Sequence, residues 1–218
     1  MNDKYKLTKN KKHIGDKVLY QIEALKDFAN VSKGDLGGWI EAEKNLSVSG
    51  NAWVYGDAWV YGDASVFGNA MVFGDAMVFG NARVFGNARV FGNAMVFGDA
   101  RVYGDAWFSG DARVYGDASV FGNARVYGDA RVSGDARVSG DAIFWISRIG
   151  SGNGTLTAFL DKDQKLCVTR GCFYGTIEEF KEAVKKTHGD SELGLEYKAA
   201  IALIELRSKR FNVQGRVR

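Results

Sequence analysis

The fold is decided by residues 52–105, which read AWVYGD AWVYGD ASVFGN AMVFGD AMVFGN ARVFGN ARVFGN AMVFGD ARVYGD. The period of six continues without an insertion, so that alanine stands at every sixth position from Ala52 to Ala142. Each alanine and the apolar residue two positions later point to the same side of a short strand, because side chains alternate along a strand. A Gly-Asn or Gly-Asp pair follows each strand, and these residues tolerate the positive φ of a tight corner.

Three such strands and corners close one triangular coil, the arrangement of hexapeptide β-helices. The sequence therefore predicts an all-β solenoid, a left-handed parallel β-helix of about six coils over residues 36–149. Upstream, the repeat phase predicts that Leu36, Ala42 and Val48 take the valine position and that Ile40 and Leu46 take the alanine position.

Both ends of the chain depart from the repeat. Residues 1–35 alternate weakly and predict an N-terminal strand cap over the open edge of the solenoid. Residues 150–218 predict a hairpin followed by two helices, which cap the last coil or help the chain to oligomerise. A capping box at Thr176 opens the first of these helices and Gly189 closes it. The second is expected at 191–209, and its predicted apolar side consists of Leu195, Tyr197, Ala200, Ile201, Ile204 and Leu206.

Composition and charge limit the classes of function. The formal net charge is +3, but residues 36–149 carry more acidic than basic side chains, which does not favour a nucleic-acid-binding stripe. The first residues lack an apolar signal segment, and no long apolar run predicts a membrane span. We therefore expect a cytoplasmic protein without a membrane partner. Cys167 and Cys172 are the only cysteines, and we expect both to be reduced thiols.

Residues three hexads apart should stack vertically and form columns of outward side chains. The first column holds Trp53, Met71, Arg89, Trp107, Arg125 and Ile143; the second holds Trp59, Met77, Met95, Arg113 and Arg131; the third holds Ser65, Arg83, Arg101, Ser119 and Arg137. Beside each column runs a ladder of Phe and Tyr rings. Exposed apolar patches of this size indicate an interface. We expect a homo-oligomer, by preference a trimer, that buries Trp53, Trp59, Met71, Met77 and Met95.

Arginines beside aromatic rings suit a phosphate-bearing or nucleotide-type ligand. The candidate ligand-binding residues are Arg83, Arg89, Arg101, Tyr103 and Trp107. The alternative is that these arginines pair with the corner aspartates.

The sequence predicts no catalytic residue, no metal site and no cofactor. Acyltransferases with hexapeptide repeats use a histidine and a projecting loop, but His13 and His188 lie outside the coils and no loop interrupts the hexads. A zinc site with three imidazoles would need one more histidine than the chain has. We expect His188 to interact with carbonyl groups at a helix end.

Three parts of the chain carry a resemblance: ALKDFANVSKGDLGGWIEAEKNLS at 24–47, the GNAxV/GDAxV array, and GCFYGTIEEFKEAVKKTHG at 171–189. Together they resemble a largely uncharacterised family of phage and prophage left-handed β-helix hexapeptide-repeat proteins, sometimes labelled as transferases. The resemblance implies expression in the cytoplasm of an infected bacterium. It favours a non-enzymatic binding protein, such as an anti-defence factor that sequesters a nucleotide immune signal or a host defence protein. The alternatives are a hexapeptide-repeat acyltransferase and a structural phage component.

Overall fold

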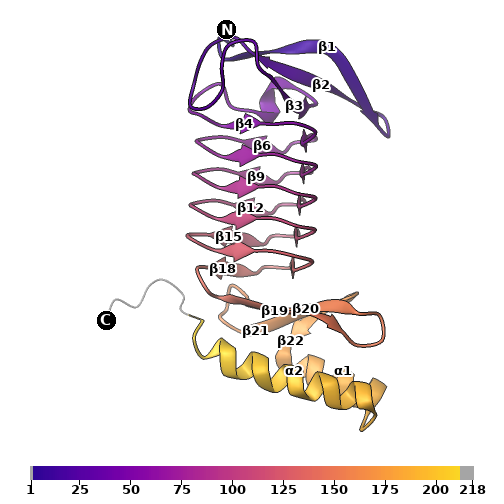
Figure 1. The fold of residues 1–218 in the computed structure, drawn as a ribbon. Coiled ribbons are helices and arrows are strands. Elements are labelled where there is room, and N and C mark those ends of the chain that lie inside the picture. Colours follow the sequence, from indigo (N-terminus) through magenta and orange to yellow (C-terminus); the bar gives the residue numbers. More distant parts are fainter. Residues whose placement is uncertain (1, 212–218) are drawn as a thin grey trace, which may run out of the picture.

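The computed structural model describes residues 2–211. Its middle is a parallel β-solenoid of about six coils, with a strand hairpin at one end and a small sheet with two helices at the other (Figure 1). Each coil contributes one short strand to each of three faces. Face 1 consists of β4 (Trp53–Val54), β7 (Met71–Val72), β10 (Arg89–Val90), β13 (Trp107–Phe108) and β16 (Arg125–Val126). Face 2 consists of β3 (Leu36–Ile40), β5 (Trp59–Val60), β8 (Met77–Val78), β11 (Met95–Val96), β14 (Arg113–Val114) and β17 (Arg131–Val132). Face 3 consists of β6 (Ser65–Val66), β9 (Arg83–Val84), β12 (Arg101–Val102), β15 (Ser119–Phe121) and β18 (Arg137–Ser139).

Residues three hexads apart are neighbours in adjacent strands, as the period predicts. On face 1, Met71 pairs with Arg89, and Arg89 pairs with Trp107. On face 3, Arg83 pairs with Arg101. The predicted columns of outward side chains are therefore confirmed from β4 to β18.

The interior of the solenoid is filled by the alanine and valine positions of the hexads. These side chains are at most 1% exposed from Ala52 to Val138, with Phe108 replacing valine once. Each fully buried valine contributes roughly 1.5–3 kcal/mol before conformational entropy is subtracted.

The aromatic ladders run along the corners. On the ladder between faces 3 and 1, Phe67, Phe85, Tyr103 and Phe121 lie nearly parallel, with centroids 4.8, 4.8 and 5.2 Å apart. Beside the rings, corner amides donate to the next coil, as Asn81 does to Asp99 at 3.0 Å. The stacked rings join neighbouring coils outside the core as far as Phe121, and serine takes the ring position at 109, 133 and 139.

The first coil departs from the predicted phase. Ile40 pairs with Val60 and Leu46 with Val66, so both occupy the valine position and not the alanine position. Leu36, Ala42 and Val48 were predicted to take the valine position. Leu36 and Val48 are exposed, and Ala42 lies half-buried before a 3-10 turn, η1 (Glu43–Asn45). The reason is that LSVSGNA places two more residues than a regular hexad between the buried positions Leu46 and Val54.

The N-terminal cap is a hairpin of β1 (Tyr5–Ile14) and β2 (Lys17–Ala24), which extends face 2 through β3. The buried Lys4 donates its Nζ to the carbonyl oxygens of Ala52 (2.7 Å) and Ser47 (3.1 Å). The cap thus closes the open end of the solenoid with both apolar and polar contacts.

The C-terminal cap begins earlier than the predicted boundary at residue 150. β19 (Ile143–Ile149) pairs antiparallel with β20 (Gly154–Leu160). Ile143 therefore does not pair with β16 and is not, as had been predicted, part of the first column. β21 (Leu166–Arg170) and β22 (Phe173–Thr176) complete a four-stranded sheet. The predicted hairpin is its β20–β21 pair, and β18 is the last strand of the solenoid.

Two helices cover this sheet. α1 (Ile177–His188) begins with the predicted capping box of Thr176 and Glu179 and ends at Gly189. α2 (Glu192–Ser208) matches the second predicted helix. Tyr197, Ala200, Ile201 and Ile204 are buried as expected, whereas Leu195 and Leu206 are 56% and 57% exposed, because they lie on the opposite side of the helix.

Among residues 2–211, neither helix has the length and apolar character that crossing a lipid bilayer requires.

Candidate ligand-binding site

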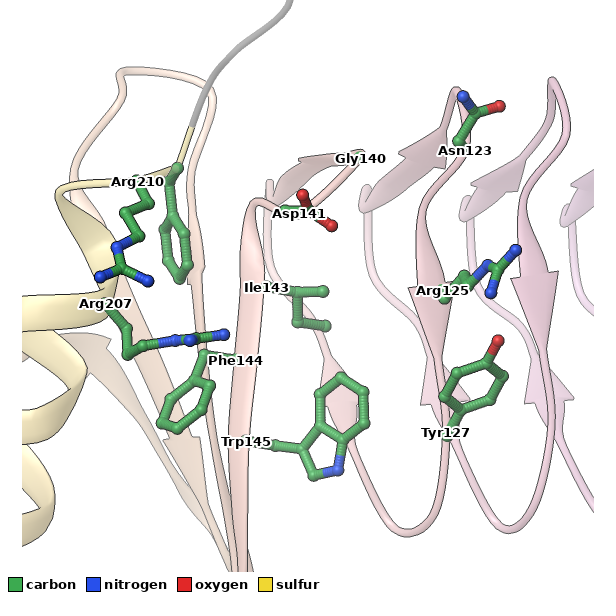
Figure 2. Close-up of a pocket in the computed structure, with 11 residues that line it drawn as sticks. Asn123, Arg125, Tyr127, Gly140, Asp141, Ile143, Phe144, Trp145, Arg207 and Arg210 are labelled. Carbon is green, nitrogen blue, oxygen red and sulfur yellow. The ribbon is translucent and has the colours of Figure 1, made fainter.

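A cavity of about 720 Å³ lies where the solenoid meets the C-terminal cap. It forms there because β19 turns away to pair with β20 and leaves β16 as the last strand of face 1. Figure 2 shows three walls: β16 and its corners on one side, β19 in the middle, and the end of α2 opposite. The lining residues are Asn123, Arg125, Tyr127, Gly140, Asp141, Ile143, Phe144, Trp145, Arg207, Arg210 and Phe211.

We call this cavity the junction pocket. Three guanidinium groups give it a positive charge. Arg125 comes from face 1, and its guanidinium lies 5.8 Å from the ring centre of Trp107. Arg207 comes from the last turn of α2, with its guanidinium 5.1 Å from the ring centre of Phe144. Arg210 follows just beyond the helix and is exposed. Asp141 is the one carboxylate among the described lining residues.

The guanidinium groups are not neutralised by ion pairs in the part of the chain that the structure describes. Every ion pair within 4 Å there involves a lysine, such as Lys162 with Asp135 at 2.7 Å. The corner aspartates Asp99, Asp105 and Asp111 instead accept hydrogen bonds from asparagines of the neighbouring coil. Three others, Asp57, Asp63 and Asp135, pair with lysines. The pairing of arginines with corner aspartates, considered as an alternative from the sequence, is therefore wrong for residues 2–211.

Aromatic side chains form the apolar part of the pocket. Tyr127 and Trp145 meet edge to face, with ring centroids 6.2 Å apart. Both are half-buried. Ring surfaces next to guanidinium groups suit a ligand that combines an anion with a flat ring.

The residues predicted from the sequence to bind a ligand lie on two faces, outside the junction pocket. Arg89 and Trp107 are neighbours on face 1, with the guanidinium 5.2 Å from the indole centre. Arg83 and Arg101 are neighbours on face 3. Tyr103 is stacked between Phe85 and Phe121, so both faces of its ring are covered. Ligand binding by these residues stays a prediction.

One of the five residues predicted to form an oligomer interface, Trp53, is not available on the surface. Trp53 is 1% exposed, because the rings of Phe28 and Tyr5 near the N-terminus pack against it. Their ring centroids lie 5.3 and 6.2 Å from that of Trp53. Its inclusion in an interface was wrong: the chain itself covers this tryptophan. The remaining members are half-buried on the coils and leave the trimer a prediction: Trp59, Met71, Met77 and Met95.

The histidine and the cysteines of the C-terminal cap lie away from the junction pocket. The His188 ring stacks on Tyr197 at 5.5 Å. Cys167 is buried, Cys172 is exposed, and both are free thiols. In the described residues no group of three or more His, Cys, Asp or Glu side chains is arranged to hold a metal ion.

Comparison with known proteins finds one family model. Four stretches of the coils match the YdcK Beta solenoid repeat: residues 82–96, 88–104, 118–134 and 130–144. The chain thus carries repeats of a β-solenoid repeat family, in agreement with its three-sided coils. No curated protein matches the chain.

Proposed function

We propose that this protein is a non-enzymatic binding protein that captures a small anionic ligand of nucleotide type in the junction pocket. One observation carries the proposal: Arg125, Arg207 and Arg210 line a cavity of about 720 Å³ together with the rings of Tyr127 and Trp145. A pocket of this volume lies within the range typical of small-molecule sites.

Phosphate groups would be held by the arginines. A guanidinium presents a planar fork of donors that matches phosphate oxygens, and charge-assisted hydrogen bonds of this kind are the strong ones. The guanidinium of Arg207 lies over the ring of Phe144, and that of Arg125 over the ring of Trp107, and such cation–π contacts favour these positions. Side chains that already favour their bound positions lose less freedom when the ligand binds, which favours affinity.

The base or another flat ring would lie against the aromatic wall. Stacking of a base on an aromatic side chain contributes roughly 1–3 kcal/mol per base. Trp145 and Asn123 supply ring surface and amide groups within the same pocket. The lining thus combines side chains for both parts of a nucleotide.

The biological setting of the proposal rests on the sequence resemblance to phage proteins. A phage protein with such a site would sequester a nucleotide signal of the host defence in the bacterial cytoplasm. A host protein as partner, an acyltransferase activity and a structural role in the virion are the competing functions.

Calorimetric titration of the purified protein with cyclic nucleotides and ADP-ribose derivatives tests this function. We expect at least one of them to bind, and the variant Arg207→Ala to weaken that binding at least tenfold. The matched control is Arg83→Ala, an exposed arginine on face 3, which should bind as the unaltered protein does. Absence of heat with every compound, or loss of binding in Arg83→Ala alone, would refute the junction pocket as the site.

A further inference from the structure

One side of α2 is apolar and has no partner in the part of the chain that the structure describes. Leu195, Ala199, Ala202 and Leu206 recur at intervals of four, three and four residues, so they form one line along the helix. All four are exposed, and Leu203 beside them is 43% exposed. We call this line the α2 stripe.

The stripe lies opposite the buried side of the helix. Tyr197, Ala200, Ile201 and Ile204 face the C-terminal sheet and α1, and they are at most 6% exposed. α2 is therefore apolar on two sides, whereas a helix on the surface of a monomer is apolar on one. A cavity of about 730 Å³ between α1 and α2 adjoins the stripe at Ala202, and most of its other lining residues are charged. The apolar area is therefore bounded by charged side chains on this side.

The charges at the two ends of α2 indicate what covers the stripe. Glu192 is exposed at the N-terminal end, and Lys209 and Arg210 are exposed just beyond the C-terminal end. Two antiparallel copies of the helix would place Glu192 of each chain beside the basic end of the other. Antiparallel helix dipoles add to this attraction, because each positive end meets a negative one. A parallel pair would oppose like charges.

We propose that the α2 stripe joins two copies of this chain in a symmetric dimer with antiparallel α2 helices. In such a pair Leu195 of one copy meets Leu206 of the other, and Ala199 meets Ala202, since a two-fold axis pairs each position with its counterpart. The small alanines at the centre allow the two helices to approach closely. α2 forms the outer end of the molecule (Figure 1), so the two solenoids point away from each other in this dimer.

Light scattering coupled to size-exclusion chromatography of the full chain tests the dimer. We expect the mass of two chains at about 100 µM and the mass of one chain for the double variant Leu195→Glu/Leu206→Glu. The matched control is Leu36→Glu, a 55% exposed leucine at the opposite end of the molecule, which should remain dimeric. Far-UV circular dichroism checks that both variants are folded. A monomer for the unaltered chain, or a trimer that the double variant does not disturb, overturns the proposal.

A charge exchange tests the antiparallel arrangement. Glu192→Lys should weaken the dimer severalfold, because a lysine would then face the basic end of the partner. Adding Lys209→Glu to this variant should restore dimerisation. If the dimer of Glu192→Lys/Lys209→Glu is no tighter than the dimer of Glu192→Lys alone, the antiparallel pairing is contradicted. Ligand titrations remain a separate measurement, so failure of the dimer and failure of the proposed ligand site are distinguishable.

Discussion

Gly104 stacks on Gly122 at the corner between faces 3 and 1 so closely that a Cβ on Gly104 would lie 2.9 Å from the amide nitrogen of Gly122. Gly104 also has a φ of +71°, in the left-handed region that favours glycine. The glycines of the hexads therefore do more than turn the chain. They leave room for the backbone of the next coil.

We predict that Gly104→Ala destabilises the protein by about 3 kcal/mol, from the left-handed backbone and from the steric overlap together. Urea unfolding followed by circular dichroism measures the loss. Gly140→Ala is the matched control: Gly140 lies in the same column with a φ of +53°, but a Cβ there meets no atom within 4 Å. We expect a loss of about 1 kcal/mol for it. Equal losses for the two variants would contradict close stacking at the corner.

A second prediction compares two tryptophans of one column. Trp53 is 1% exposed beneath the N-terminal cap, and Trp107 is 36% exposed on the same face. Trp53→Ala should lower the free energy of unfolding by about 3–5 kcal/mol, because it leaves a cavity under the cap. Trp107→Ala should lower it by about 1 kcal/mol or less. A larger loss for Trp107→Ala would show that the cap does not enclose Trp53 as described.

The repeat predicted most of the solenoid because its period is strict. One spacing sets the strand, the corner and the neighbour in the next coil, so the columns from Trp53 to Arg137 follow from counting residues. The prediction was wrong where the period is not strict. The longer turn after Leu46 shifts the first coil, and the pairing of β19 with β20 removes Ile143 from its column.

The junction pocket could not be predicted in the same way. Arg125 belongs to the repeat, whereas Arg207 belongs to a helix far along the chain, and only the packing of the C-terminal cap brings them to one cavity. One available signal was the basic end of the second predicted helix. The repeat pointed instead to Arg83, Arg89 and Arg101, because it specifies neighbours on the coils alone.

A third prediction concerns the two thiols. Burial, together with the smaller effect of the nearby carboxylate of Asp161, raises the pKa of Cys167 to about 11. Since the thiolate is the reactive form, Cys167 should be inert at pH 8 in the folded protein, whereas the exposed Cys172 should react. Labelling with a chromogenic disulfide reagent should detect one thiol per folded chain and two after unfolding. Cys172→Ser should abolish the fast reaction; its persistence in that variant would contradict the burial of Cys167.

A fourth prediction is a pH dependence at the N-terminal cap. Burial, together with the smaller effect of the positive charge of Lys26, lowers the pKa of Lys4 from 10.5 to about 8. Between about pH 8 and 10.5 the unfolded chain therefore binds more protons at this group than the folded chain, so its contribution to stability rises with pH. That contribution is lost as the pH falls through 8.

The variant Lys4→Met lacks this titration. We expect the difference in unfolding free energy between the unaltered protein and Lys4→Met to grow, in favour of the unaltered protein, from pH 8 to pH 10. Taking the difference removes the opposing contribution of groups such as Tyr5, whose pKa burial raises. Lys9→Met, at an exposed position of β1, the strand that follows Lys4, serves as the control and should show no such trend. A flat difference for Lys4→Met would mean that Lys4 is not buried in the cap.

The most direct measurement is mass spectrometry of the small molecules that the purified protein releases on denaturation, compared with the folded variant Trp145→Ala. The proposed function predicts that the unaltered protein releases a phosphate-bearing compound with an aromatic ring, close to one per pocket, and that Trp145→Ala releases far less. Equal release from both proteins, or no such compound from either together with no binding of added nucleotides, would contradict ligand capture in the junction pocket.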